Sequence, residues 1–400
     1  MASDAKSLQP RWGYRTTLFQ FRKPAFWLFV LVMVVGALVT FAEQSFFRQM
    51  SPSGWGLSWL LVLVYAAPVF MVVYLLDLFE REPISLVVAA LLWGAVAATA
   101  LAGLANQGWG LVVARIGGPD FASRWTAALT APWVEEILKV LGVVLIALIA
   151  RDEIDDVMDG FVYGALCGLG FAVVEDVFYF MAVFGGEPAG VLTGFFVRVI
   201  ASGLYGHLLY SGIAGIGVAY FVARKGQATL LKRLLVAGGL FLFAMLAHFI
   251  WNSPWLDFFP DMPWTGSDWL VIPLATAVKG VPFLILVCVM VVLARRRERR
   301  WFRIAVDSEL GGDGLLKDEF DVVQYPRRRR RARREMRARA GPRAAALLKR
   351  LQREQVNLAM IRTRVHRDDH PDLMRQRLYC KSLRDALVAM PGAPSAADGS

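Results

Sequence analysis

Cysteine and charge are both scarce in this sequence. The three cysteines, Cys167, Cys288 and Cys380, include no pair in an external loop, so we expect no structural disulfide. Charged residues make up 19% of the 400 positions, whereas hydrophobic residues make up 56%. With a mean hydropathy of +0.47, this composition argues against an ordinary soluble domain and indicates a polytopic membrane protein.

The sequence also lacks a recognisable signal-peptide cleavage site and an internal repeat. Lys6, Arg11 and three further basic residues precede the first apolar run, near 25–42, and no small-residue cleavage site follows it. We therefore expect this run to remain as a signal anchor. The apolar runs are continuous rather than alternating, which favours helices as the spanning elements.

The predicted fold is an all-α polytopic membrane protein with about eight transmembrane helices and a helical, Arg-rich cytoplasmic tail. The sixth apolar run is too long for one straight crossing of roughly 20 residues, so we expect it to begin with a kinked or interfacial piece. The expected spans are 25–42, 57–76, 84–106, 125–150, 159–184, 191–223, 232–252 and 268–294. The expected parts are a cytoplasmic segment 1–24, a transmembrane domain 25–295, a cytoplasmic helical tail 296–390 and a disordered end 391–400.

The net charge of +11 is concentrated in particular loops and in the tail. Basic residues fall on one side of the predicted spans, and arginines crowd 294–303 and 327–350. By the positive-inside rule, both termini of this multi-pass protein lie in the cytoplasm, at the cell membrane. The arginines then serve topology and attraction to anionic lipid. We do not expect nucleic-acid binding, because no recognised fold or aromatic interleaving accompanies the charge.

Ionisable side chains interrupt four of the apolar runs. Charged groups at membrane depth are costly and mark functional sites by default. Their estimated depths converge on one layer, between the midplane and the outer boundary, which favours chemistry inside the membrane. These groups are Glu135, Glu136 and Lys139 in one run, and Glu175, His207 and His248 in later runs.

Local spacing places several of these groups on shared helix faces. Lys139 lies three and four residues after the paired glutamates, so it can neutralise one carboxylate and leave the other for proton transfer. His248 and Asn252 are also four residues apart, which suits two donors aimed at one point. An inert ion-pair network remains an alternative for the glutamates, and a helix–helix hydrogen bond for His207.

The glycines of the fifth apolar run follow a small-residue pattern. Close helix packing explains this spacing, and we assign these glycines no chemistry. They are Gly160, Gly164, Gly168 and Gly170.

Taken in order, these motifs resemble the PrsW family of intramembrane proteases over roughly residues 60–295. The matching stretches are Glu135-Glu136-x-x-Lys139, Gly168-x-Gly170-Phe171-Ala172-x-x-Glu175, Tyr205-Gly206-His207, His248-x-x-Trp251-Asn252 and the boundary motif Asp77-x-x-Glu80-x-Glu82-Pro83. The sequence departs from the family at Asp176, where an asparagine is common. This extra carboxylate either alters its surroundings or faces away.

The resemblance implies an all-helical fold related to the CAAX prenyl proteases and to a noncatalytic scaffold subunit of γ-secretase. It implies an intramembrane endopeptidase, metallo-type or glutamate-type, that cuts a membrane-anchored protein, such as an anti-sigma factor, near the extracytoplasmic side. By this resemblance Glu135 is the general base, and His248 with Asn252 stabilises the oxyanion. We expect Glu136 and Lys139 to assist Glu135, and Glu175, His207 and His248 to hold any divalent metal, such as zinc.

Two other classes of protein fit part of this pattern. Buried Glu and His chains are also typical of proton-coupled transporters and channels, although the sequence shows no inverted repeat. A noncatalytic membrane scaffold is the second alternative, since polar residues retained on a fold do not prove turnover. The sequence lacks a helical His-Glu-x-x-His motif, so a metal is not assured. It leaves open the substrate, the cut site and the oligomeric state.

Overall fold

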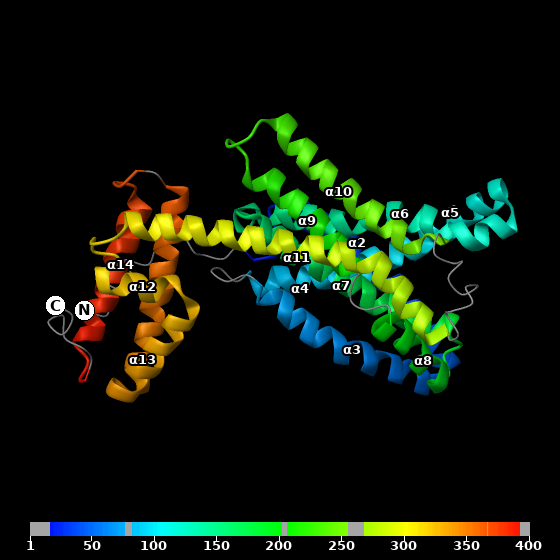
Figure 1. Ribbon diagram of the computed structural model, residues 1–400, viewed down its shortest axis with the longest axis horizontal. Coiled ribbons are helices and arrows are strands. Elements are labelled where there is room, and N and C mark those ends of the chain that lie inside the picture. Colours follow the sequence, from blue (N-terminus) through cyan, green and yellow to red (C-terminus); the bar gives the residue numbers. More distant parts are fainter. Residues whose placement is uncertain (1–16, 77–81, 202–205, 255–267, 366, 393–400) are drawn as a thin grey trace. The chain divides into compact units, whose positions relative to one another are not determined.

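The predicted all-helical membrane fold is confirmed. The computed structural model describes residues 17–76, 82–201, 206–254, 268–365 and 367–392, and these form helices without a β-sheet (Figure 1). Some expectations fall outside the described residues: the charges at Asp77, Glu80 and Arg81, the residue Tyr205, and the disordered end from residue 393 onward.

The helices of the described residues follow in chain order. Their bounds are α2 Pro24–Met50, α3 Pro52–Tyr74, α4 Ile84–Leu92, η1 Trp93–Ala98, α5 Thr99–Gly117, α6 Pro119–Ile149, η2 Arg151–Glu153, α7 Val157–Phe178, η3 Tyr179–Val183, α8 Pro188–Phe195, η4 Phe196–Ala201, α9 His207–Ala223, α10 Leu230–Asn252, α11 Asp268–Ser308, α12 Lys317–Gln324, α13 Pro326–Arg364 and α14 Pro371–Val388.

Proline and capping residues begin several of these helices. Proline occupies the first helical position of α2, α3, α6 and α8, where its missing N–H breaks no hydrogen bond. Gly118, with φ of 82°, makes the turn between α5 and α6. Asp156 caps α7, and its backbone N–H donates to Asp159 Oδ2 at 2.8 Å. These local signals fix where the two helices that carry the acidic motifs begin.

Six helical segments among the described residues are long and apolar enough to cross a membrane. They are Pro24–Met50, Pro52–Tyr74, Ile84–Gly117, Val157–Val183, Leu230–Asn252 and Pro273–Ser308. The other two predicted spans correspond to α6, which carries three charged residues close together, and to a broken segment. That segment consists of the shorter apolar helices Pro188–Ala201 and His207–Ala223, which agrees with the expected irregular start of the sixth span.

Helix α7 is the centre of the unit formed by Thr16–Val292. Within its most apolar window 67% of the residues are buried, against 17% in α2 and α3. A Cβ on Gly168 would lie 2.2 Å from the His207 carbonyl oxygen, and a Cβ on Gly164 would lie 2.1 Å from that of Ser211. The predicted small-residue packing therefore brings the start of α9 against the backbone of α7.

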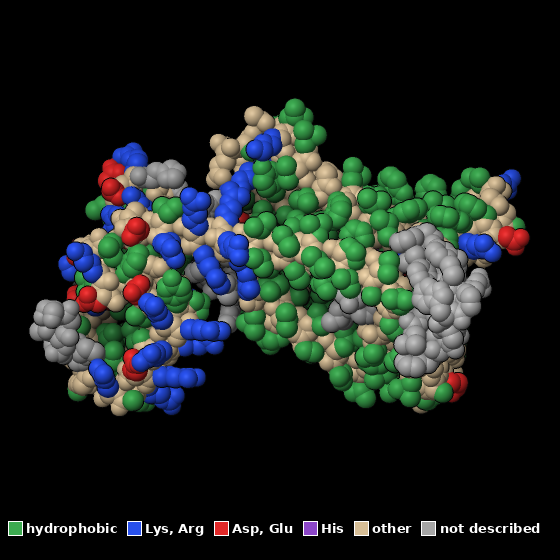
Figure 2. All heavy atoms as spheres, viewed as in Figure 1, with side chains coloured by type: hydrophobic (Ala, Val, Ile, Leu, Met, Phe, Trp, Pro, Cys, Tyr) green, Lys and Arg blue, Asp and Glu red, His purple; other side chains and the backbone are tan. Residues whose placement is uncertain are grey.

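The outer surface of this unit is apolar. Leu31 and Leu38 on α2 and Leu63 on α3 are among many exposed hydrophobic residues, and Figure 2 shows such side chains over most of its visible face. A surface this extensive and apolar is typical of contact with lipid. The protein is therefore a multi-pass membrane protein.

The second compact unit contains Leu293–Ser400 and has a hydrophobic core of its own. The core includes Leu351 and Leu358 from α13 and Leu373 and Leu383 from α14. Arg384 of α14 donates to Glu319 of α12 at 2.6 Å. Helix α12 begins at Lys317, because residues 309–316 form turns.

The three cysteines are free thiols. Burial in the core of the second unit raises the pKa of the Cys380 thiol. A thiol held in its protonated form is a poor nucleophile, so Cys380 is a packing residue.

Candidate active site

The three charged residues of α6 form one buried cluster. Lys139 Nζ donates to Glu135 Oε2 at 3.2 Å and to Glu136 Oε1 at 2.9 Å. The side chains of Lys139 and Glu136 are fully buried, and that of Glu135 is 4% exposed. Spacings of three and four residues placed these groups on one helix face, as predicted. Lys139 bonds to both carboxylates rather than to one.

His207, the first residue of α9, joins this cluster through one ring nitrogen. Its Nδ1 lies 2.7 Å from Lys139 Nζ and 3.7 Å from Glu135 Oε2. Since an ammonium group only donates, Nδ1 must accept and the ring proton must be on Nε2. Nε2 lies 2.9 Å from Glu175 Oε2 on α7, so Nε2–H donates to that carboxylate. The lone pair of Nδ1 faces the side of Glu135.

His248 in the last turn of α10 is oriented in a similar way. Its Nδ1 lies 3.0 Å from Glu136 Oε1, and because a carboxylate only accepts, Nδ1 carries the proton. In the neutral ring Nε2 is then the acceptor, and it lies 3.8 Å from Glu135 Oε2. Ser211 Oγ donates to the other oxygen of Glu136 at 3.2 Å, and the Tyr210 ring stacks on His248 with centroids 5.1 Å apart.

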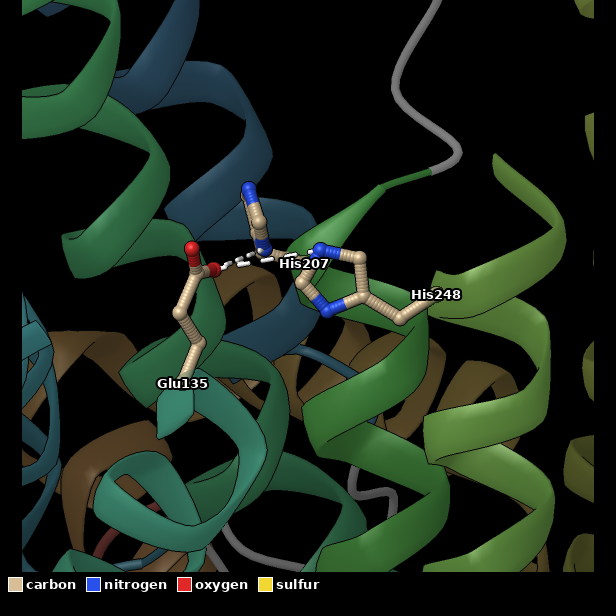
Figure 3. Close-up of side chains that lie close together, drawn as sticks. All are labelled: Glu135, His207 and His248. Carbon is tan, nitrogen blue, oxygen red and sulfur yellow. Dashed lines mark ion pairs between the residues drawn. The ribbon is translucent and has the colours of Figure 1, made fainter. Parts of the chain in front are cut away.

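Two imidazole lone pairs and one carboxylate oxygen therefore converge. The ligand atoms of Glu135, His207 and His248 all lie within 4.8 Å of one another (Figure 3). This donor set matches catalytic zinc sites, which use three protein ligands and leave one position open. Each histidine is also held from behind by a second carboxylate, Glu175 or Glu136, as metal-bound imidazoles usually are.

The charge balance of the cluster also suits a cation. Four carboxylates, those of Glu135, Glu136, Glu175 and Asp176, face two cationic side chains, Lys139 and Arg198. With both histidines neutral, this leaves an excess of negative charge that a divalent cation would balance. Lys139 already donates to His207 Nδ1, so an ion bound there would displace that hydrogen bond. The residues present fit a divalent metal.

A second ionic cluster lies beside the first. Arg198 of η4 binds Glu175 Oε2 through Nη2 at 2.7 Å and Asp176 Oδ1 through Nε at 2.6 Å. Tyr65 OH donates to Asp176 Oδ2 at 2.8 Å, and the Arg198 guanidinium stacks on the Tyr179 ring at 3.7 Å. Asp176 is thus a buried partner of Arg198 and does not face away from the protein.

The two clusters share a small cavity of about 100 Å³. Its polar lining comes from Tyr65, Asp176, Arg198 and His207, and its apolar lining includes Leu169 and Trp251. A cavity of this size with several polar partners can hold a few water molecules. Water can therefore reach the edge of His207, as a hydrolytic reaction requires.

Asn252, one turn after His248, is not directed into the glutamate cluster. Its Nδ2 donates to the Ala127 carbonyl oxygen of α6 at 3.3 Å. Glu82, the described acidic residue of the boundary motif, is buried and accepts a hydrogen bond from Tyr163 OH. The structure therefore brings Glu135, Glu136, Lys139, Glu175, His207 and His248 together. Asn252, at the end of α10, lies outside this cluster and bonds to the backbone of α6.

Sequence reasoning did not assign a role to four polar residues at this site. Arg198 carried a clear signal, since an arginine in an apolar segment is rare without a partner. Asn106 on α5 donates from Nδ2 to Glu135 Oε1 at 3.1 Å. Tyr65, Asn106 and Ser211 are uncharged, so composition gave no reason to single them out.

Comparisons with known proteins point to one family. The profile described as PrsW family intramembrane metalloprotease matches residues 82–298, a range that holds all the predicted site residues. Protease PrsW of Bacillus subtilis (strain 168) is 29% identical over 201 residues, which cover 48% of this chain and 84% of that protein. No solved structure matches the chain. Since the profile covers more than half of the chain, this protein belongs to the PrsW family of intramembrane proteases.

Proposed function

We propose that this protein hydrolyses peptide bonds of membrane-anchored proteins, with Glu135 as the group that activates water. One observation carries the proposal: Oε2 of a buried glutamate lies within 4 Å of Lys139 Nζ and of a nitrogen on each of two histidines. A structural ion pair requires one partner for each charge. Here a single carboxylate is surrounded by two oriented imidazoles and by a lysine that stabilises its ionised form. This is the arrangement expected for general acid–base catalysis.

Different residues of the site have different roles in the proposed reaction. Glu135 accepts a proton from water, which then attacks the peptide carbonyl, and Glu135 returns the proton to the leaving amine. Lys139 holds the two glutamates together, and Glu136 keeps the His248 ring fixed. We assign oxyanion stabilisation to His248 and Asn252 in the reaction without metal. His248 would have to carry a second proton, on Nε2, because its Nδ1–H is bonded to Glu136. Asn252 would have to exchange its bond to the Ala127 carbonyl for one to the substrate.

We further propose that the site takes a divalent cation such as zinc. Glu135, His207 and His248 would hold it, because their ligand atoms converge. When bound, such an ion polarises a carbonyl oxygen and lowers the pKa of water. The set expected from the sequence was Glu175, His207 and His248. We now place Glu175 behind His207, because it lies on the ring nitrogen opposite the one that faces Glu135. With an ion bound, Glu135 would be one of its ligands. In a glutamate-type reaction without metal, Glu135 is the general base described above.

The substrate class and the membrane orientation are part of the proposal. The loop charges favour a protein of the cell membrane with both termini in the cytoplasm. With that orientation the site is reached from the extracytoplasmic half of the membrane. We therefore propose cleavage of a single-span protein, such as an anti-sigma factor, near its extracytoplasmic end, as a step in signalling.

The test uses detergent-purified protein and a single-span peptide with several candidate cut sites. We expect cleavage by the wild-type protein, detected by mass spectrometry, and loss of about 10²–10⁴ in rate for Glu135→Gln, which keeps the shape and removes the base. Binding without cleavage would favour the scaffold alternative. Proton flux in proteoliposomes without cleavage would favour a transporter, and either result would overturn the proposal.

A further inference from the structure

Asn106 contacts the one oxygen of Glu135 that faces away from the histidines. Its Nδ2 donates to Glu135 Oε1 at 3.1 Å, whereas Lys139, His207 and His248 all lie on the side of Oε2. Asn106 is on α5, and α5 packs along α6 after the turn at Gly118. The two oxygens of the Glu135 carboxylate therefore have different partners, and Asn106 is the partner of Oε1.

The other end of the same amide has no partner. Asn106 Oδ1 is buried, and no hydrogen-bond partner for it is found in the part of the chain that the structure describes. The orientation of the amide follows from chemistry, because a carboxylate accepts and only the Nδ2 group can donate to it. The unsatisfied atom is thus an acceptor, next to the catalytic glutamate. Buried polar groups without a partner are rare and call for an explanation.

A water molecule that Glu135 activates could donate a hydrogen bond to this acceptor. Water has two O–H groups, and the one that Glu135 deprotonates must point at the carboxylate. The second O–H needs an acceptor of its own, or the lone pair of the water is free to turn away from the substrate carbonyl. Asn106 Oδ1 can accept that O–H while Nδ2 of the same residue holds Glu135 in place.

We propose that Asn106 positions Glu135 through Nδ2 and orients the attacking water through Oδ1. This inference rests on the proposed function. In the step, one O–H bond of water breaks and its proton passes to Glu135, while the water oxygen forms a bond to the peptide carbon. The C–N bond then breaks, and the nitrogen keeps the electron pair and takes the proton from Glu135. Asn106 neither gains nor loses a proton.

The experiment compares three variants of the full-length protein on the single-span peptide. Asn106→Leu removes donor and acceptor and keeps the branching at Cγ, and we expect kcat to fall about 10–100-fold while KM stays within about twofold. Gln107→Leu is the matched control, since Gln107 is the next residue of the same helix and is exposed. We expect Gln107→Leu to cleave at the wild-type rate.

Asn106→Asp separates positioning from a merely structural role. A protonated carboxyl group keeps one donor and one acceptor, whereas an ionised one repels Glu135. We expect the activity of Asn106→Asp relative to wild type to be highest at low pH and to fall about tenfold or more as the pH rises through the range in which the new carboxyl group ionises. The same pH series on the wild type and on Gln107→Leu supplies the reference.

Three outcomes would overturn the inference in a preparation where the wild type cleaves. They are wild-type kcat in Asn106→Leu, a rise in KM without a fall in kcat, and a pH-independent defect in Asn106→Asp. Thermal melting of each purified variant identifies misfolding, and because Asn106→Asp is nearly isosteric it remains informative where Asn106→Leu does not fold. Absence of cleavage by the wild type would instead reject the proposed function.

Discussion

His248 Nδ1 lies 3.0 Å from Oε1 of Glu136, which turns the opposite ring nitrogen of His248 toward Glu135. Adjacent glutamates on α6 thus contact the same imidazole from its two sides. The arrangement separates the roles of the paired carboxylates: Glu136 is fully buried and bound to Lys139, Ser211 and His248, whereas Glu135 lies where the histidine nitrogens converge.

Replacement of Glu136 should therefore reduce activity less than replacement of Glu135. Glu136→Gln keeps the shape but loses the charge that fixes the proton on His248 Nδ1, and we expect kcat to fall about 10–100-fold. Steady-state cleavage of the single-span peptide by both variants gives the comparison. A Glu136→Gln variant as inactive as Glu135→Gln would contradict this division of roles between the two carboxylates.

Removal of a bound metal should inactivate the enzyme. We expect purified wild-type protein to contain a divalent ion by elemental analysis, and strong chelation to remove both the ion and the activity. Because Glu175 lies behind His207, Glu175→Gln should weaken ion binding about 10–100-fold, whereas His207→Ala and His248→Ala should abolish it.

Two results would contradict this assignment of ligands. Full activity in protein shown to be free of metal would support the glutamate-type mechanism. Loss of the ion in Glu175→Gln, together with its retention in Glu135→Ala, would restore the set of ligands expected from the sequence.

Arg198 should be needed for stability because it is bonded to two buried carboxylates. Arg198→Gln leaves Glu175 and Asp176 without their cation, and breaking a buried pair in this way costs about 3–5 kcal/mol. Arg198 is 23% exposed at its side chain, so the lower end of that range applies. We expect a clear fall in melting temperature in detergent.

A double variant provides the control for this effect. Asp176→Asn, which places at this position the residue common in the family, removes one of the two uncompensated charges. The pair Arg198→Gln with Asp176→Asn should melt above Arg198→Gln alone. Equal melting temperatures would show that the ion pair contributes little to folding.

The second compact unit should be dispensable for peptide-bond hydrolysis. Its helices enclose their own hydrophobic core, and all the site residues belong to Thr16–Val292. Deletion of Asp307–Ser400, which retains the arginines at 295–303, should leave insertion and cleavage of a solubilised peptide intact. Complete loss of cleavage by a well-folded truncation would show that this unit acts on the site.

The same truncation should weaken binding to anionic lipid. Burial and the neighbouring cations Arg333 and Arg330 lower the pKa of Arg329 to about 10. Arginines outnumber acidic residues in this stretch of α13. Each basic residue near an anionic surface contributes about 1 kcal/mol of attraction. Sedimentation with vesicles that contain anionic or only neutral lipid measures the difference, and equal binding by the full-length and truncated protein would refute it.

Much of the site could be predicted because its residues obey local rules. The spacing of Glu135, Glu136 and Lys139 fixes their common face within a single helix, and the glycine spacing of α7 predicts a close neighbour without naming it. Each charged residue within an apolar segment could be singled out, because a charge is costly in the hydrocarbon core of the membrane. These features depend on one helix at a time, which is why the sequence is sufficient to predict them.

The remaining features depend on how separate helices are rotated against one another. The sequence does not reveal that Arg198 reaches both Glu175 and Asp176, since η4 is a π-helical segment and a regular helix would turn the side chain elsewhere. The proton positions on His207 and His248 follow from partners on other helices. Asn106 is neutral, so nothing in the composition of α5 distinguishes it.

The charge content of α6 has a consequence for the biogenesis of the protein. On scales of translocon-mediated insertion, each charged residue at a helix centre costs about 3 kcal/mol, and α6 carries Glu135, Glu136 and Lys139 close together. The groups that bond to Glu136 from α9 and α10, Ser211 and His248, are synthesised 75 and 112 residues later. We therefore expect stable integration of α6 to wait for helices not yet made when it leaves the ribosome, so that the event that completes insertion would also assemble the proposed site.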